Sequence, residues 1–190
     1  MKRSAINAIV KDAEIFFDKN HWALPPNPKW DVTDFGLNDF KNYGLVLVNL
    51  AEEKEYCEKI MYAKKGMKTP FHCHKKKKED IIVRIGQMAI IVHKNHPEHS
   101  GNESDFTIQI NGMPSKIKPG NNIILNAGER ITLIPGLIHE FWPVSEECIL
   151  GEVSTANDDQ HDNFFLNPAV GRFSEIEEDE VPYVKLVSDN

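Results

Sequence analysis

The chain has 190 residues, of which 41% are hydrophobic and 27% charged, and its formal net charge is -7. These values are typical of one globular domain with a sizeable core. The negative charge argues against nucleic-acid binding, which depends on neutralising phosphates, and no apolar run approaches the roughly 20 residues that span a bilayer. Cys57, Cys73 and Cys148 lack a metal-binding spacing, so we expect reduced thiols in a cytoplasmic protein.

Residues 1–44 are predicted to form a helix followed by a loop that wraps the body. Ser4 is placed as the N-cap of an amphipathic helix, and Asp12 and Glu14 interrupt the apolar segment that a signal peptide would need. The stretch WALPPNPKWDVTDFG, residues 22–36, contains three prolines, which exclude a helix or a central strand. The apolar residues of the helix recur at i, i+3 and i+4 spacing: Ile6, Ile9, Val10, Ala13, Phe16 and Phe17.

Residues 45–155 contain short β-rich runs separated by turn residues, a pattern that predicts an all-β sandwich or barrel. The runs are GLVLVNL, EKIMYA, DIIVRIGQMAIIV, DFTIQING, NNIILNAG, RITLIPG and CILGEVST. The polar stretch 93–105 is predicted to be a hairpin tip. Its histidines, His93, His96 and His99, are interpreted as solvated loop residues, since a loop lacks the rigid hydrogen-bonded support of a metal site; the alternative is that they bind adventitious metal.

The segment TPFHCHKKKKED, residues 69–80, contains the first candidate metal ligands. Residues i and i+2 of a strand share a face, so His72 and His74 point the same way, with Glu79 shortly after them. His139, at the edge of another β-run, completes a set of four. Imidazole and carboxylate ligands together suit Mn, Fe, Zn or Ni.

The spacing of these residues matches the cupin motifs. Gly66, His72, His74, Glu79 and Gly86 match the first motif at every position. The second motif is matched in part: Gly128, Gly136 and His139 fit, whereas Pro135 is one place late and the expected asparagine is missing. We therefore predict a cupin jelly-roll barrel with a four-ligand metal site; the alternative is a metal-free cupin that kept only the shape.

A tight turn at 65–66 would place Lys59 directly opposite His72 in an antiparallel hairpin, facing the metal. A turn at 145–146 would likewise place Glu152 opposite His139. A turn one residue longer would point both side chains away. The alternative for Lys59 is a solvent-facing position, whereas Glu152 lies in an apolar run where an unpaired charge is costly.

The lysine run between the histidines and Glu79 fills the variable gap of the motif. Lys75, Lys76, Lys77 and Lys78 are therefore predicted to be solvated loop side chains. The alternative is that one of them reaches an anionic substrate or the acidic C-terminal tail.

With these residues in place, the chain resembles the D-lyxose ketol-isomerases, a family of small cupin sugar isomerases. The resemblance rests on EKIMYAKKGMKTPFHCHKKKKEDII, GEVSTANDDQHDNFF and GRFSEIEEDEVP, and it covers nearly the whole chain. The last two segments are not general cupin features. Residues 1–190 are thus expected to form one all-β cupin domain with an N-terminal α-helix, in which 45–155 form the metal-binding barrel and 156–190 close the site.

The resemblance implies an enzyme that interconverts D-lyxose with D-xylulose and D-mannose with D-fructose. It implies Mn2+, with Co2+, Fe2+, Ni2+ or Zn2+ as replacements, and a homodimer. His72, His74, Glu79 and His139 match the metal ligands, and Lys59 matches an active-site lysine. Arg172 and either Asp159 or Asp162 match the polar residues that contact the sugar.

Such an isomerase must remove a carbon-bound proton next to a carbonyl. A divalent ion chelated by O1 and O2 would polarise the carbonyl and stabilise a cis-enediolate. Glu79, Glu152 and an aspartate of the 159–162 segment are candidates for the base, and Lys59 would stabilise the enediolate oxygen; a hydride shift is the alternative.

Three other functions compete with this prediction. An Fe(II)-dependent cupin dioxygenase would use the same ligand types but favours an apolar pocket, whereas the candidates here are polar. A second alternative is a non-catalytic sugar-binding cupin, such as a sensor. It is disfavoured because the sequence shows no effector domain through which a regulator would act. A phosphosugar isomerase is disfavoured by the acidic charge balance.

Overall fold

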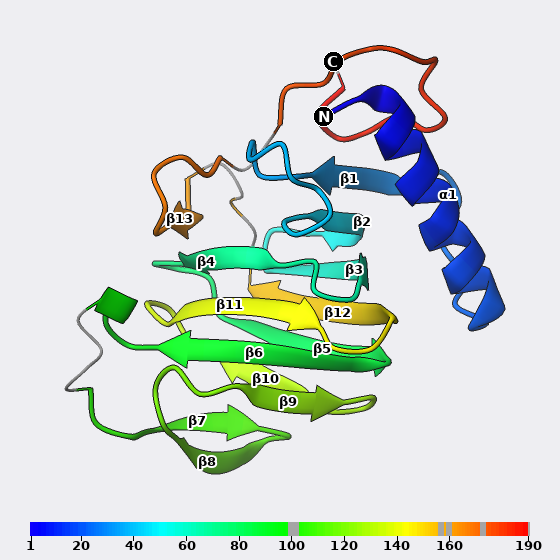
Figure 1. Ribbon diagram of the computed structural model, residues 1–190. Helices are drawn as coiled ribbons and strands as arrows, with labels where there is room; N and C mark the ends of the chain where they lie inside the picture. The colour runs from blue at the N-terminus through cyan, green and yellow to red at the C-terminus, as the bar shows by residue number, and fades with distance from the viewer. Residues whose placement is uncertain (99–102, 156–157, 159–160, 172–173, 190) are drawn as a thin grey trace.

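The computed structural model describes residues 1–98, 103–155, 158, 161–171 and 174–189. In this part of the chain two antiparallel sheets face each other, and helix α1 (Arg3–Lys19) packs outside one edge of the larger sheet (Figure 1). The strands are β1 (Lys29–Thr33), β2 (Leu45–Glu52), β3 (Tyr56–Lys64), β4 (Thr69–Cys73), β5 (Glu79–Ile85), β6 (Gln87–His93), β7 (Phe106–Ile110), β8 (Met113–Ile117), β9 (Ile123–Asn126), β10 (Arg130–Leu133), β11 (Ile138–Pro143), β12 (Glu147–Thr155) and β13 (Phe164–Phe165).

The strand order is β1-β2-β3-β12-β5-β10-β7-β8 in the larger sheet and β13-β4-β11-β6-β9 in the smaller one. This arrangement confirms the predicted all-β cupin fold with an N-terminal helix. No described helix has the length and apolar character needed to cross a membrane.

The core has two parts because side chains of a strand alternate between its faces. Inward-facing residues such as Val83, Ile90 and Leu150 fill the space between the two sheets. Outward-facing residues of β1 to β3 pack instead against the apolar stripe of α1, where Val10 and Phe17 are fully buried. On β5 the inward face carries Ile81 and Val83, both buried, and the same alternation points Glu79 inward.

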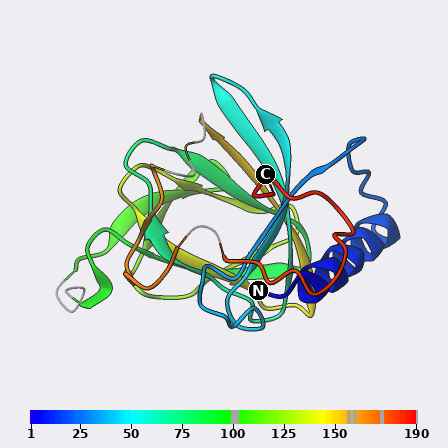
Figure 2. The same cartoon turned by 90° about the horizontal axis from the view of Figure 1, so that it is seen from above.

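The helix begins one residue before the predicted cap. Lys2 occupies the N-cap position without a side-chain cap, so the prediction of Ser4 as N-cap is wrong. Ser4 lies in the first turn, and its N–H and hydroxyl donate to Asp179 at 2.8 and 2.7 Å. The C-terminal segment runs beside the start of the helix (Figure 2). A carboxylate from the far end of the chain therefore satisfies the helix N-terminus and interacts favourably with its dipole.

Arg3 ties these two chain ends together. Its side chain is 2% exposed and donates to Glu178 at 2.8 and 2.6 Å and to Asp189 at 2.6 and 3.3 Å. We expect Arg3→Met to lower the free energy of unfolding by about 2 kcal/mol, since it removes charge-assisted bonds and leaves Asp189 half-buried without its partner. Urea denaturation measures this, with exposed Lys2→Met as the control. An equal loss in both variants would contradict it.

The prediction that the proline-rich stretch forms only a wrapping loop is partly wrong. Residues 29–33 form β1, which pairs with β2 and lies at the end of the larger sheet. The prolines all precede the strand, where no ladder donor is needed. Trp30, on β1, is 1% exposed and packs beside α1.

The run DIIVRIGQMAIIV forms two strands in opposite sheets, β5 and β6. The chain crosses between the sheets at Gly86, whose φ is +87° and where a Cβ would lie 2.8 Å from the carbonyl oxygen of Glu147. Only glycine fits such a close approach with this backbone conformation.

The stretch 93–105 joins β6 of the smaller sheet to β7 of the larger one, so the predicted hairpin tip is wrong. His93 is on β6 and buried, with Nδ1 3.5 Å from Oε2 of Glu103, which also contradicts the solvated position predicted for it. His96 lies near the surface, and His99 lies outside the described residues.

Candidate metal centre

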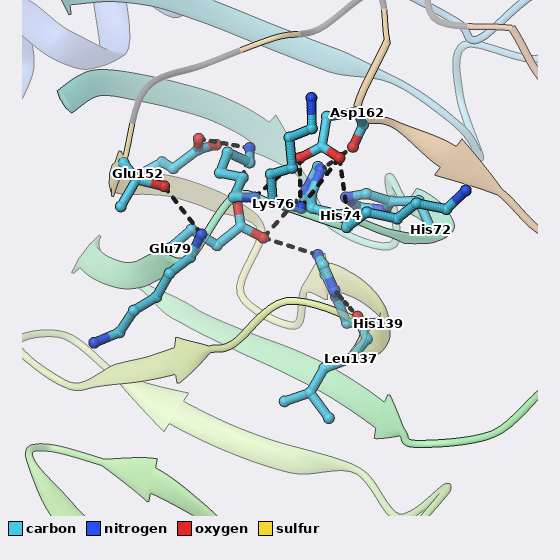
Figure 3. Close-up of polar contacts among 12 residues, drawn as sticks. His72, His74, Lys76, Glu79, Leu137, His139, Glu152 and Asp162 are labelled. Carbon is cyan, nitrogen blue, oxygen red and sulfur yellow. Dashed lines mark hydrogen bonds and ion pairs between the residues drawn. The ribbon is translucent and has the colours of Figure 1, made fainter. Parts of the chain in front are cut away.

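Four side chains from both sheets converge in the barrel: His72 on β4, His74 immediately after it, Glu79 on β5 and His139 on β11. Each offers a ligand atom, and the four atoms all lie within 4.8 Å of one another. All four side chains are buried. Figure 3 shows the carboxylate of Glu79 pointing towards the ring of His139. The structure thus brings together all four residues that the sequence predicted as metal ligands.

Backbone carbonyls orient each histidine ring. Nδ1 of His72 lies 2.7 Å from the carbonyl oxygen of Pro70, and Nδ1 of His139 lies 3.1 Å from that of Leu137. Nδ1 of His74 lies 2.7 Å from the carbonyl oxygen of Asp162. A carbonyl only accepts, so each Nδ1 carries the proton and each Nε2 presents a lone pair.

Three polar atoms at the middle of this cluster have no hydrogen-bond partner among the described residues. They are Nε2 of His74, Nε2 of His139 and Oε1 of Glu79. Unsatisfied polar atoms are costly when buried. A divalent cation bound by these atoms would remove that cost, and three imidazoles with one carboxylate form a suitable ligand set. The residues present therefore fit a divalent metal.

Burial keeps His72 in the form that binds metals. Desolvation, followed by the neighbouring His139 and His74, holds the pKa of His72 well below its usual value. Because the ring therefore stays neutral near pH 7, its Nε2 lone pair is available without the release of a proton.

Glu79 has its two oxygens in different surroundings. Oε1 lies 3.1 Å from Nε2 of His139 and 3.4 Å from Nε2 of His74, whereas Oε2 lies 2.8 Å from Nζ of Lys77. Burial alone would raise the pKa of Glu79, but the charge of Lys77 outweighs it and holds the pKa well below its usual value. Glu79 is thus held as a carboxylate with one oxygen towards the ligand set.

Lys77 contradicts the prediction for the lysine run. Lys75, Lys76 and Lys78 are exposed as predicted, but Lys77 is buried, and its Nζ also lies 3.0 Å from Oε1 of Glu152. Burial would lower the pKa of Lys77, yet the charges of Glu152 and Glu79 more than offset this and raise it.

Asp162 determines how the lysine loop is oriented. Its buried carboxylate accepts hydrogen bonds from the backbone N–H groups of Lys75, Lys76 and Lys77, at 2.9 to 3.2 Å. This cradle holds the loop so that the side chain of Lys77 is buried and its Nζ reaches Oε1 of Glu152. No pattern within the four lysines distinguishes Lys77 from the others. The residue that determines its position, Asp162, lies 85 residues later in the chain.

The carboxylate of Asp162 accepts hydrogen bonds from the backbone of the lysine loop. Its predicted contact with the sugar stays a prediction. Asp159 and Arg172, which the sequence also predicted to contact the sugar, lie outside the described residues.

Lys59 and Glu152 both line the same cavity as the ligands, but the predicted registers are wrong. Lys59 lies opposite Asn49 and Glu152, and His72 lies opposite His139 and Phe165. The turns at 65–66 and 145–146 lead from one sheet to the other instead of closing hairpins. Lys59 and Glu152 therefore face the histidines across the space between the sheets, with Lys59 Nζ 3.8 Å from Oε1 of Glu152.

The cavity lies between the two sheets and is lined by side chains from both. Its charged lining consists of Lys59, Lys77, Glu79 and Glu152, beside His72 and His74. The rest is apolar or neutral: Phe35, Leu45, Leu47, Met61, Thr69, Ile81, Phe141, Asn163 and Phe165.

Comparison with known proteins identifies the family. The family model described as D-lyxose isomerase matches residues 27–190. The chain belongs to this family. It is 37% identical to the D-lyxose/D-mannose isomerase of Escherichia coli O157:H7, an alignment that covers 100% of this chain and 98% of the relative. It is 36% identical to the enzyme of the same name from Serratia proteamaculans, over 96% and 94%.

Solved structures similar to this family member share its fold. The L-ribose isomerase of Cellulomonas parahominis without ligand superposes with a TM-score of 0.71 at 16% identity, covering 93% of this chain and 98% of the other. The L-ribose isomerase of Acinetobacter sp. DL28 in complex with L-ribose gives 0.69 at 19% identity, with the same coverage.

Proposed function

We propose that this chain is a metal-dependent aldose–ketose isomerase that interconverts D-lyxose with D-xylulose and D-mannose with D-fructose. The substrates follow from its relatives, which are named D-lyxose/D-mannose isomerases. One observation carries the proposal: three residues of the four-residue cluster, His72, His74 and Glu79, line one cavity together with a separate carboxylate, Glu152, and two lysines.

When bound by His72, His74, Glu79 and His139, a divalent ion would supply Lewis acidity to the sugar carbonyl and its neighbouring hydroxyl. We propose Mn2+ for this position, because a carboxylate ligand beside three imidazoles favours a harder ion than thiolate sites do. Co2+, Fe2+, Ni2+ and Zn2+ fit the same ligands.

The protein side chains would move the proton between C1 and C2 of the sugar. Glu152, which projects from β12 into the cavity, would take the proton from one carbon and return it to the other. Glu79 is less suited, because one of its oxygens faces the ligand cluster and the other lies against Lys77. Lys59 and Lys77 would stabilise negative charge as it develops on the sugar oxygens of the enediol intermediate.

The charged lining weighs against a dioxygenase, for which an apolar pocket is expected. It also weighs against a phosphosugar substrate, since both lysines in the cavity already lie beside carboxylates. We further propose that residues 1–190 act as one cupin domain, that the protein is a cytoplasmic homodimer, and that residues 156–190 close the site.

Chelation tests the proposed function. We expect EDTA-treated protein to lose conversion of D-lyxose to D-xylulose, and added Mn2+ to restore it, with Co2+, Fe2+, Zn2+ and Ni2+ assayed in parallel. The same measurement under anaerobic conditions excludes an oxygenase if activity persists. Failure of every metal to support ketose formation from D-lyxose or D-mannose would overturn the proposal.

A further inference from the structure

Phe35 is a bulky residue with an unusual backbone conformation. Its φ is +57°, in the left-handed region that aromatic residues seldom adopt, and it is 1% exposed. Its side chain lines the same cavity as the metal-ligand cluster. Such conformations persist where surrounding contacts impose them, and they are concentrated at functional sites.

Contacts from both chain ends impose this conformation. The N–H of Phe35 donates to Oγ1 of Thr33 at 2.9 Å, and its carbonyl accepts from the N–H of Gly171 at 3.0 Å. Ser174 adds a hydroxyl that lies 3.1 Å from Oγ1 of Thr33 and accepts from the N–H of Asp34 at 3.1 Å. The C-terminal segment thus holds the end of β1 so that Phe35 turns into the barrel.

Two ring contacts connect Phe35 to the metal-ligand cluster. The rings of Phe35 and Phe165 meet edge to face, with centroids 5.7 Å apart, and the ring of Phe165 lies 5.6 Å from that of His72. The ring of Phe165 therefore packs between Phe35 and His72, and Phe35 is separated from the metal-ligand cluster by this second aromatic ring.

Strand order places Phe35 at the opposite end of the cavity from Glu79. In the larger sheet β5 carries Glu79, β12 carries Glu152, β3 carries Lys59 and β2 carries Leu47, in that order. Phe35 follows β1, which comes next. In the smaller sheet the order β11, β4, β13 likewise runs from His139 to Phe165. Along the larger sheet the charged side chains of the lining end at Lys59 on β3, and the lining residues beyond β3, Leu45, Leu47 and Phe35, are apolar.

We propose that Phe35 closes the apolar end of the cavity and limits the length of sugar that the enzyme accepts. This inference rests on the proposed function, which places C1 and C2 of the sugar at the metal ligands. The far end of the sugar then points towards Phe35, and the sixth carbon of a hexose with its hydroxyl lies nearer to that ring than the last carbon of a pentose. Phe35 is a specificity residue, selecting pentoses over hexoses.

Two substitutions at this position test the inference. Phe35→Gly removes the ring, and glycine adopts positive φ without strain, so the backbone conformation is retained. Phe35→Leu keeps an apolar but smaller side chain. Phe40→Leu is the matched control, because Phe40 belongs to the same connection but packs against the core on the helix side. We expect the ratio of kcat/KM for D-mannose to that for D-lyxose to rise about tenfold in Phe35→Gly, less in Phe35→Leu, and not in Phe40→Leu.

The outcomes separate this inference from the proposed function. Wild-type protein that converts neither sugar with any metal overturns both. Wild-type protein that converts D-lyxose, with a ratio unchanged in the Phe35 variants, overturns the role of Phe35 alone. If Phe35→Gly shows no cooperative thermal melt, the ratio measured for Phe35→Leu decides.

Discussion

Glu152→Gln is expected to lower kcat for D-lyxose about a thousandfold, the scale of a lost general base. Glutamine has nearly the same shape and keeps hydrogen-bonding capacity towards Lys77 and Lys59, but it cannot accept the proton. Because Glu152 is not one of the four clustered ligands, the variant should retain bound metal.

Turnover with metal content measured on the same sample checks this expectation. Glu146→Gln is the control, since that carboxylate sits in the turn before β12 with its side chain 83% exposed. Unchanged turnover in Glu152→Gln would remove Glu152 from the reaction and leave Glu79 as the carboxylate to test. Loss of both metal and turnover would show instead that Glu152 supports the metal site.

Lys77→Met is expected to reduce both stability and catalysis. Its ammonium lies between two buried carboxylates, Glu79 at 2.8 Å and Glu152 at 3.0 Å. Removing one partner of a buried charge pair typically costs about 3–5 kcal/mol, because the remaining charge is left uncompensated. We expect a loss of that size in the free energy of unfolding of the metal-free protein.

We also expect kcat of Lys77→Met to fall about a hundredfold with a smaller change in KM, because Lys77 orients Glu79 and Glu152 and stabilises charge during the reaction. Urea denaturation of metal-free protein and steady-state kinetics of metal-loaded protein measure the two effects separately. Lys76→Met, one residue away and exposed, is the control. Equal behaviour of the two variants would contradict the role of Lys77.

The convergence of the four candidate metal ligands was predictable because these residues obey local rules. His72 and His74 share a face through the period of two along a strand, and the spacing to Glu79 and to His139 follows the cupin motifs. The fold class was predictable for the same reason, since short alternating runs between turn residues indicate facing sheets.

The pairing of the strands was not predictable from those rules. Short turns suggested hairpins that would place Lys59 beside His72 and Glu152 beside His139. The chain instead crosses to the opposite sheet at both turns, so Lys59 pairs with Glu152. Both residues still reach the cavity, because inward-facing side chains of two facing sheets meet in the middle.

The four clustered residues, the fold class and the family were predictable because they depend on spacing along the chain. Which lysine of the run is buried, and how Phe35 is turned into the cavity, depends on tertiary contacts. Lys77 points inward because Asp162 binds the loop backbone, and Phe35 because Gly171 and Ser174 hold its segment. These contacts join residues far apart in sequence, and no local periodicity encodes them.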